Sequence, residues 1–267
     1  MKTFIKLYND IKQVVSFFSK QLRFDKFKNK LGRKLALALE EIISLAIFKQ
    51  KNHIATKKSL YDIFEPDCSY KTLVVNLNRW YSLALIILAL IMEVNKKNSH
   101  LVKHTDSTDI PVCSDRKAKY HQTMKGLANW GYTGKGAFFG LKLHITCDLE
   151  RKLLAIKFTS GNIDDREVFI KLNDDLLGWF VTDAGCVSEK LARAFYIEHK
   201  RILLATPRKN MRKLMTKFQA WLQSTRMIIE LNFRCLKCFY GLITSLPRSV
   251  DGYLANYIYS LLAYQIA

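Results

Sequence analysis

The sequence predicts an α/β fold, in which a mixed sheet with helices on both faces follows an N-terminal helical bundle of the helix-turn-helix-like kind. Apolar residues follow helical spacing up to about residue 98, and the alternation typical of strands begins at residue 101. Antiparallel strand patterns then give way to alternating strands and helices, which is the order expected of a mixed sheet. We therefore expect two domains, residues 1–98 and residues 99–267.

The N-terminal domain shows three segments of helical pattern. Apolar residues recur at helix spacing from Leu35 to Ile47, the segment SLYDIF stops before Pro66, and one long apolar helix is expected from Tyr70 to Val94. The polar joint between the first two segments is rich in lysine. Its lysines either contact phosphate or form a solvated joint without a function, and both interpretations stay open: Lys49, Lys51, Lys57 and Lys58.

Composition argues against a membrane span or a disulfide framework. The longest apolar run, Trp80 to Met92, is shorter than the ~20 residues that a span needs, so a buried core helix is expected. Charged residues interrupt the apolar residues near the N-terminus, which is not typical of a secretory signal. Cys235 and Cys238 form a single CxxC without a second ligand pair, so reduced thiols in a cytoplasmic protein are expected.

Strands and helices alternate in the C-terminal domain. Strands 136–148 and 153–161 are expected to form a meander, and strand 101–108 to lie beside them. Residues such as Leu143 and Ile145 share one face of the second strand, while Lys142 and His144 share the other. The remaining expected elements are a helix at 164–176, a strand at 179–185, a helix at 188–199, a strand at 201–207, and helices at 223–241 and 249–265.

The charge balance points to a polyanionic partner. The chain has 43 Lys and Arg residues against 23 Asp and Glu residues, a formal net charge of +20. Such a field attracts nucleic acid before any specific contact forms, and an anionic membrane surface is the competing partner. An acidic-tail protein or a typical enzyme of small metabolites is disfavoured.

Three acids stand where the expected topology would bring them together. Asp106 lies in the first strand, Asp183 ends the fourth, and Glu230 lies on the helix after the fifth. Active groups of open sheets gather at strand ends, and a helix over that edge can add a third side chain. Clustered carboxylates repel one another, whereas Mg²⁺ or Mn²⁺ holds them ionised. Two such ions ~3.5–4 Å apart activate a nucleophile at a phosphodiester.

The helix that carries Glu230 has one charged and one apolar face. Arg226, Glu230, Arg234 and Lys237 follow each other at helical spacing on one face. A surface ion pair between Glu230 and Arg234 explains the same pattern without any function. The adjoining apolar stripe, expected to pack on the sheet, consists of Ile229, Phe233, Leu236 and Tyr240.

Five segments taken together resemble a known family. HTDSTDIPVC, GYTGKGAFFGLKLHI, GNIDDREVF, VTDAGC and RMIIELNFRCLK look like segments of bacterial insertion-sequence transposases of the DDE type, with an RNase H-like fold. The resemblance runs from about Leu101 to the C-terminus. GRKLALALEEIISLAIF also looks like the helical N-terminal region of those proteins.

The resemblance implies a site and a reaction. Asp106, Asp183 and Glu230 match the catalytic, metal-binding triad of the family, which holds two Mg²⁺ or Mn²⁺ ions. The implied reaction is strand cleavage at transposon ends and strand transfer into target DNA, by a homodimer or higher oligomer on DNA near the nucleoid, without a membrane. Around the second acid this chain has Asp183-Ala184-Gly185-Cys186, where the family usually has a basic residue and an aromatic. That departure predicts weaker DNA contacts or a decaying copy.

Basic residues near the acids are candidate DNA contacts. Lys142 shares the polar face of its strand with His144, and the helix of Glu230 offers Arg234 and Lys237. Arg208 and Lys209, with two further basic residues, directly follow the fifth strand, on the sheet edge of the acids. Each is equally explained as a solvated charge. Asp165 resembles a supporting family position, and Asp109 is a less favoured replacement for Asp106.

Alternatives of other classes remain. A related metal-dependent nuclease or resolvase would use the same triad without strand transfer. A non-catalytic DNA-binding remnant of a transposase would retain only the basic surfaces. A basic protein bound to RNA would show no requirement for divalent metal.

Overall fold

The computed structural model describes residues 2–27, 35–134, 136–183, 189–199, 201–205 and 215–266. The chain divides into two compact units. Unit 1 consists of Met1–Leu90 and Cys235–Ala267, and unit 2 consists of Ile91–Arg234.

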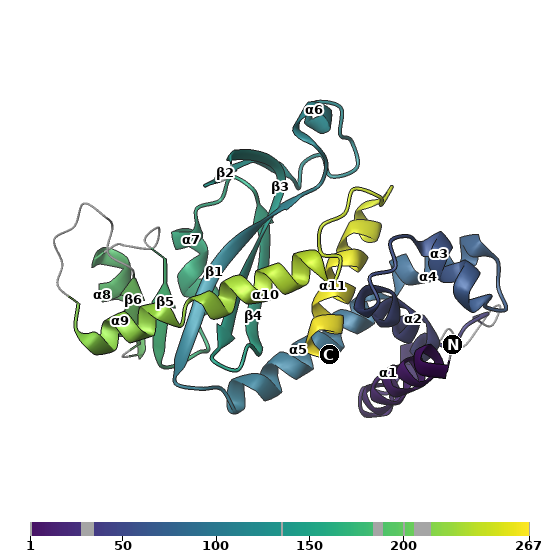
Figure 1. Ribbon diagram of the computed structural model, residues 1–267, viewed down its shortest axis with the longest axis horizontal. Helices are drawn as coiled ribbons and strands as arrows, with labels where there is room; N and C mark the ends of the chain where they lie inside the picture. The colour runs from purple at the N-terminus through teal and green to yellow at the C-terminus, as the bar shows by residue number, and fades with distance from the viewer. Residues whose placement is uncertain are drawn as a thin grey trace. The chain divides into compact units, whose positions relative to one another are not determined.

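Unit 2 contains a mixed six-stranded sheet, which confirms the predicted fold class. The hydrogen-bonded order is β2-β3-β1-β5-β6, and β4 pairs with β3. β1 pairs antiparallel with β3 and parallel with β5, which pairs parallel with β6 (Figure 1). The strands are β1 Val102–Pro111, β2 Asn129–Thr133, β3 Gly136–Asp148, β4 Leu153–Ser160, β5 Trp179–Thr182 and β6 Ile202–Ala205.

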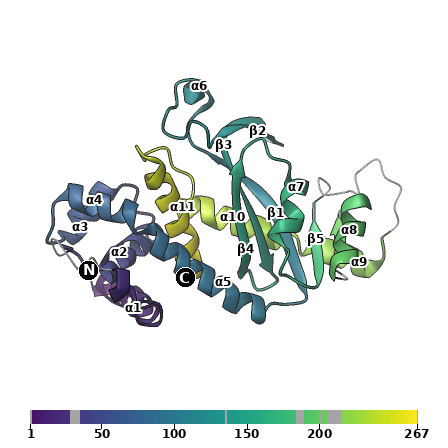
Figure 2. The same cartoon turned by 180° about the vertical axis from the view of Figure 1, so that it is seen from behind.

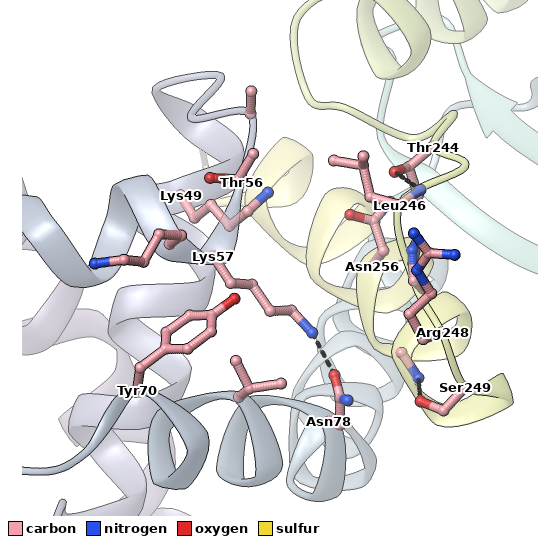
Figure 3. Close-up of a pocket in the computed structure, with 15 residues that line it drawn as sticks. Lys49, Thr56, Lys57, Tyr70, Asn78, Thr244, Leu246, Arg248, Ser249 and Asn256 are labelled. Carbon is pink, nitrogen blue, oxygen red and sulfur yellow. Dashed lines mark hydrogen bonds between the residues drawn. The ribbon is translucent and has the colours of Figure 1, made fainter.

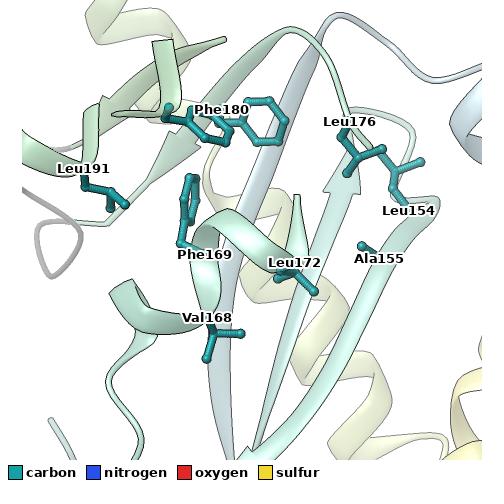
Figure 4. Close-up of a cluster of buried hydrophobic side chains, with 9 residues drawn as sticks. Leu154, Ala155, Val168, Phe169, Leu172, Leu176, Phe180 and Leu191 are labelled. Carbon is teal, nitrogen blue, oxygen red and sulfur yellow. The ribbon is translucent and has the colours of Figure 1, made fainter. Parts of the chain in front are cut away.

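Helices cover both faces of this sheet. Phe180 of β5 is buried in a ring cluster with Phe169 of α7 and Phe195 of α8 (Figure 4). The next residue, Val181, points to the opposite face and packs with Leu222 of α9. The views from front and back agree that α7 and α10 lie on opposite sides of the sheet (Figures 1 and 2). The helices are α6 Asp115–Ala118, α7 Asp165–Leu172, α8 Glu189–His199, α9 Lys217–Ser224 and α10 Met227–Cys238.

The edge strand β2 is absent from the predicted elements. It pairs antiparallel with the first residues of β3. Its glycine, Gly131, is required by close packing, because a Cβ there would lie 2.3 Å from the carbonyl oxygen of Gly161. The strand is short and contains a glycine, so its pattern resembled a loop.

Unit 1 is a bundle of helices around α2. Most residues of α2 are buried, and α2 packs against α1 and α11. The C-terminal helix α11 also packs against α4, and Tyr259 donates a hydrogen bond to the carbonyl of Leu77. The helical elements are α1 Lys2–Gln21, the 3₁₀ helix η1 Phe24–Phe27, α2 Leu39–Lys51, α3 Lys57–Phe64, α4 Tyr70–Arg79, α5 Tyr81–Lys97 and α11 Val250–Gln265.

The single helix predicted from Tyr70 to Val94 is wrong. Two helices, α4 and α5, meet at Trp80 with a bend of 41°. Trp80 ends α4 by donating its backbone N–H to the carbonyl of Asn76. No single helix among the described residues is long and apolar enough to cross a membrane, and only this bent pair passes by length and composition when taken together.

The compact units divide the chain differently from the predicted domains at one end. The first change of unit, after Leu90, lies close to the predicted boundary at residue 98. Residues 235–267, predicted in the second domain, belong to the same unit as the N-terminal helices. A division of roles between residues 1–98 and residues 99–267 stays a prediction.

Candidate active site

The parallel pair of β1 and β5 brings the first two predicted acids near each other. The printed pairing ends with His104 opposite Val181, two residues before Asp106 on β1 and two before Asp183, which follows the end of β5. Side chains alternate between faces along a strand, so Asp106 points to the face that carries His104, and the charge of Asp183 acts on its carboxyl. This is the face on which α9 and the start of α10 pack.

The environment of Asp106 penalises its negative charge. Burial raises the pKa of its carboxyl to about 7, and the nearby carboxylates of Asp183 and Asp165 act in the same direction. The backbone N–H of Ser107 donates to Asp106 Oδ1 at 2.8 Å and, together with the Arg226 guanidinium, lowers the pKa. A nearby cation would therefore stabilise this carboxylate strongly.

Arg226 connects the third acid to the first. Its Nη2 lies 3.0 Å from Glu230 Oε1 and 3.9 Å from Asp106 Oδ2. Glu230 is 60% exposed, whereas the side chain of Asp106 is 22% exposed. The arginine thus stands between two carboxylates and neutralises part of their charge, and Glu230 pairs with it rather than with Arg234.

Two hydrogen bonds between elements hold α10 on this face. Thr225, just before α10, is hydrogen-bonded to His104 Nε2 at 3.2 Å. Burial, with the charge of Arg226, lowers the pKa of His104 to about 4, so the imidazole is neutral at pH 7. Further along, buried Asn232 accepts a hydrogen bond from Arg151 Nε at 3.0 Å, at the turn between β3 and β4.

The apolar stripe predicted on α10 anchors the helix. Ile229 and Leu236 are fully buried, and Phe233 is 7% exposed. These residues face away from solvent, whereas Glu230, one position after Ile229, is exposed beside the packed face. The local sequence pattern therefore accounts for the exposure of the third acid.

The sequence matches the family described as transposase DDE domain over residues 96–249, which is more than half of the chain. The chain belongs to this family. The comparisons with curated proteins and with solved structures gave no match. All three predicted acids lie inside the matched residues, and the mixed sheet of unit 2 is consistent with the RNase H-like fold expected of a DDE transposase.

DDE transposases generally use divalent metal ions. Asp106 and Asp183 offer hard carboxylate oxygens close to each other, and the pKa of Asp106 is raised, by burial first and then by the charges of Asp183 and Asp165. Among the described residues, no three His, Cys, Asp or Glu side chains gather closely enough to hold a metal ion. The carboxylates of Asp106 and Asp183 have the chemistry that suits a divalent cation, whereas Glu230 pairs with Arg226 and would have to release it to join them.

Lys142 and His144 lie on the other face of the sheet. They are opposite Asp109 and Ser107 of β1, which alternate with Asp106. Lys142 Nζ donates to Asp165 Oδ1 at 3.3 Å and to the carbonyl of Ile163 at 2.8 Å. His144, predicted to be solvent-facing, is 3% exposed, because α7 covers this face. A DNA contact of Lys142 stays a prediction, and Asp109 is on the wrong face to replace Asp106.

The other predicted DNA contacts differ in exposure, and two of them lie outside the described residues. Arg234 is exposed on α10 and Lys237 is half-buried on the same helix. Arg208 and Lys209 lie outside the described residues, as do Ala184, Gly185 and Cys186 after the second acid.

Sequence reasoning missed Arg226 as a partner of the acids. The only signal was its spacing of four residues before Glu230, and Arg234 has the same spacing on the other side. It also missed His104, which shares the face of Asp106 and is two residues before it. The alternation along β1 could have indicated that position.

Proposed function

We propose that this chain is a DNA transposase that cleaves DNA strands at transposon ends and transfers them into target DNA. In this proposal Asp106, Asp183 and Glu230 hold two divalent ions, Mg²⁺ or Mn²⁺. When bound, such ions activate the attacking hydroxyl and stabilise the leaving oxygen of a phosphodiester.

One observation supports the proposal most: Asp106 and Asp183 each follow the last paired residues of the parallel neighbours β1 and β5 by two positions, and the charge of Asp183 raises the pKa of Asp106. Glu230 is exposed at the surface, and Arg226 links it to the carboxyl of Asp106. Belonging to the DDE family supports a transposase function for this arrangement.

The remaining side chains have supporting roles in this proposal. Neutral His104 fixes Thr225 and hence the start of α10, and Asn232 fixes its middle. Arg234 and Lys237, with Arg208, Lys209 and Lys142, would contact the DNA backbone, which positions DNA without reading its sequence. The helices of residues 1–98 would bind the terminal repeats, in a homodimer or higher oligomer at the nucleoid.

The test uses the full chain and a labelled duplex that carries the terminal repeat of the element. Asp106→Asn, Asp183→Asn and Glu230→Gln are compared with wild type for Mn²⁺-supported nicking and for binding in the presence of Ca²⁺. We expect nicking to fall about a hundredfold or more in each, a loss of about 2.7 kcal/mol. Binding should persist, because the basic surfaces are unchanged.

Matched controls separate the site from a general loss of charge. Asp109→Asn changes the same chemistry on the opposite face of β1, and Glu167→Gln removes an exposed acid at the start of α7. Both should nick at near wild-type rate. Nicking that survives in one triad variant would remove that residue from the site.

The same assay distinguishes the other functions. Nicking without joining to a target duplex would favour a nuclease, and binding without nicking by the wild-type chain would favour a DNA-binding remnant. Binding to RNA without any effect of divalent metal would contradict the proposal altogether.

A further inference from the structure

Unit 1 contains a cavity of about 480 Å³ whose charged lining is entirely basic (Figure 3). It lies among the end of α2, the start of α3, α4 and the segment that leads into α11. None of the residues that line it is acidic. Its cationic residues are Lys49, Lys57, Lys58 and Arg248.

The two half-buried lysines of this cavity have neutral partners. Lys57 Nζ donates to the side-chain carbonyl of Asn78, and Lys49 Nζ lies 3.4 Å from Gln50 Oε1. The amino group of Lys49 extends toward the segment with Leu246, whereas the amino group of Lys57 points to Asn78 of α4 (Figure 3). Lys58, in contrast, is exposed and pairs with Asp62. Among the described residues, the positive charges of Lys49 and Lys57 are therefore without a paired carboxylate.

Burial makes this charge costly. It lowers the pKa of Lys49 to about 8 and that of Lys57 to about 8, and the charge of Lys57 also lowers the pKa of Lys49. An anion between the two ammonium groups would remove both the repulsion and the lack of a counter-charge.

Two helices begin at the cavity and add to its positive potential. Thr56 caps α3 by accepting from the N–H of Ser59, and Ser249 caps α11 by accepting from the N–H of Gly252. Helix N-termini carry partial positive charge, which favours phosphate groups. Both caps are among the lining residues.

The remaining wall is apolar and aromatic. Val74, Leu246 and Pro247 line it, together with the ring of Tyr70. A ligand that matches both parts has a phosphate at one end and a flat or apolar group at the other. The volume lies within the range of small-molecule sites, so it admits more than an inorganic ion.

We propose that this cavity binds a phosphate ester of a nucleotide, with the phosphate between Lys49, Lys57 and Arg248 and the sugar or base against Tyr70. The nucleotide is either a unit of a bound DNA strand or a free nucleotide. This inference does not depend on the proposed metal site, because every lining residue belongs to unit 1 and the three acids belong to unit 2.

The test measures binding of thymidine monophosphate to the full chain by calorimetry, with thymidine and inorganic phosphate as comparison probes. We expect the monophosphate to bind more tightly than either. The double variant Lys49→Gln/Lys57→Gln should weaken this binding about tenfold or more. The pair Lys6→Gln/Lys71→Gln, which removes two exposed lysines of unit 1 outside the cavity, should change it less than twofold.

A second variant tests the cavity with a substitution that should not affect folding. Arg248 is exposed and lines the cavity, so Arg248→Gln should keep the fold while weakening the monophosphate about threefold. Competition by a short oligonucleotide would identify a DNA strand as the source, and its absence would identify a free nucleotide. Monophosphate binding no tighter than thymidine, or equal losses in the cavity and control pairs, would overturn the inference. Neither result changes the expectation for nicking by the triad.

Discussion

The acidic edge of unit 2 (Asp106, Asp183 and Glu230) and the basic cavity of unit 1 both bring like charges together. Two of the three acids share an arginine, whereas the two half-buried lysines of the cavity have only neutral partners among the described residues. Arg226 lies between Asp106 and Glu230, whereas Lys49 and Lys57 contact neutral amides. The pKa of Asp106 is raised and the pKa values of both lysines are lowered, so each region disfavours its own charge. In the acidic edge an arginine therefore neutralises part of the negative charge, whereas in the cavity only a bound anion would neutralise the charges of Lys49 and Lys57.

The largest effect is expected from removing the buried carboxylate. Asp106 has a pKa raised in the folded state, so its penalty is absent below its unfolded pKa near 4, grows between pH 4 and 7, and is complete above 7. Asp106→Asn should therefore raise the free energy of unfolding at pH 8, without divalent metal, by ~2–4 kcal/mol. Urea unfolding of wild type and Asp106→Asn from pH 4 to 8 checks this, and a gain that does not grow with pH would contradict it.

The basic cavity should give the opposite pH profile. Lys49 has a lowered pKa in the folded state, so its penalty is complete below about pH 8 and disappears as pH rises toward its unfolded pKa. Lys49→Met should raise the free energy of unfolding by ~1–3 kcal/mol at pH 7 and by little at pH 10. Thermal unfolding across this range measures it. A gain that grows with pH would contradict the assignment.

Removing Arg226 would leave Asp106 and Glu230 without their shared positive partner, as Lys49 and Lys57 are without a negative one. The pKa of Asp106 should then rise further, and a bound divalent metal ion should neutralise more of the charge of the acids. Arg226→Gln should increase the stabilisation by 5 mM Mn²⁺, measured as a thermal shift, by about 1 kcal/mol. Arg193→Gln, an exposed change of the same charge on α8, should leave the shift unchanged.

The smallest effect concerns the anchor of α10. Thr225→Val removes the hydrogen bonds of its hydroxyl to His104 Nε2 and to the carbonyl of Leu222, which should lower the free energy of unfolding by ~0.5–1.5 kcal/mol. Nicking should decrease while DNA binding is unchanged, since the substitution alters the segment between α9 and α10 that holds Arg226 and Glu230. Unchanged stability would show that the apolar stripe alone fixes the helix.

The alternation of apolar and polar residues was sufficient to predict most strands of the sheet. Alternation in residues 136–148 predicted a strand whose bounds match β3, and the order of strands and helices predicted a mixed sheet. The pattern could not place β2, whose glycine serves close backbone packing rather than local preference. It also could not detect the break at Trp80, because apolar spacing continues through it.

The sequence pattern could not predict contacts between residues that are far apart in the chain. Glu230 has an arginine four residues away on each side, and only the folded chain shows that Arg226 is the one that contacts both Glu230 and Asp106. The pairing of α11 with α2 is equally invisible, since both are simply apolar helices. The basic cavity combines residues from 49 to 256, so no segment alone contains it.

The parallel register of β1 and β5 has a consequence for how copies of such a gene would decay. A substitution in β5 alters one side chain, but a single-codon insertion between Trp179 and Asp183 would rotate Asp183 to the sheet's opposite surface. The same insertion in the connection before Trp179 would be absorbed by the loop. In-frame length changes across these few codons should thus inactivate a lineage more abruptly than point changes do.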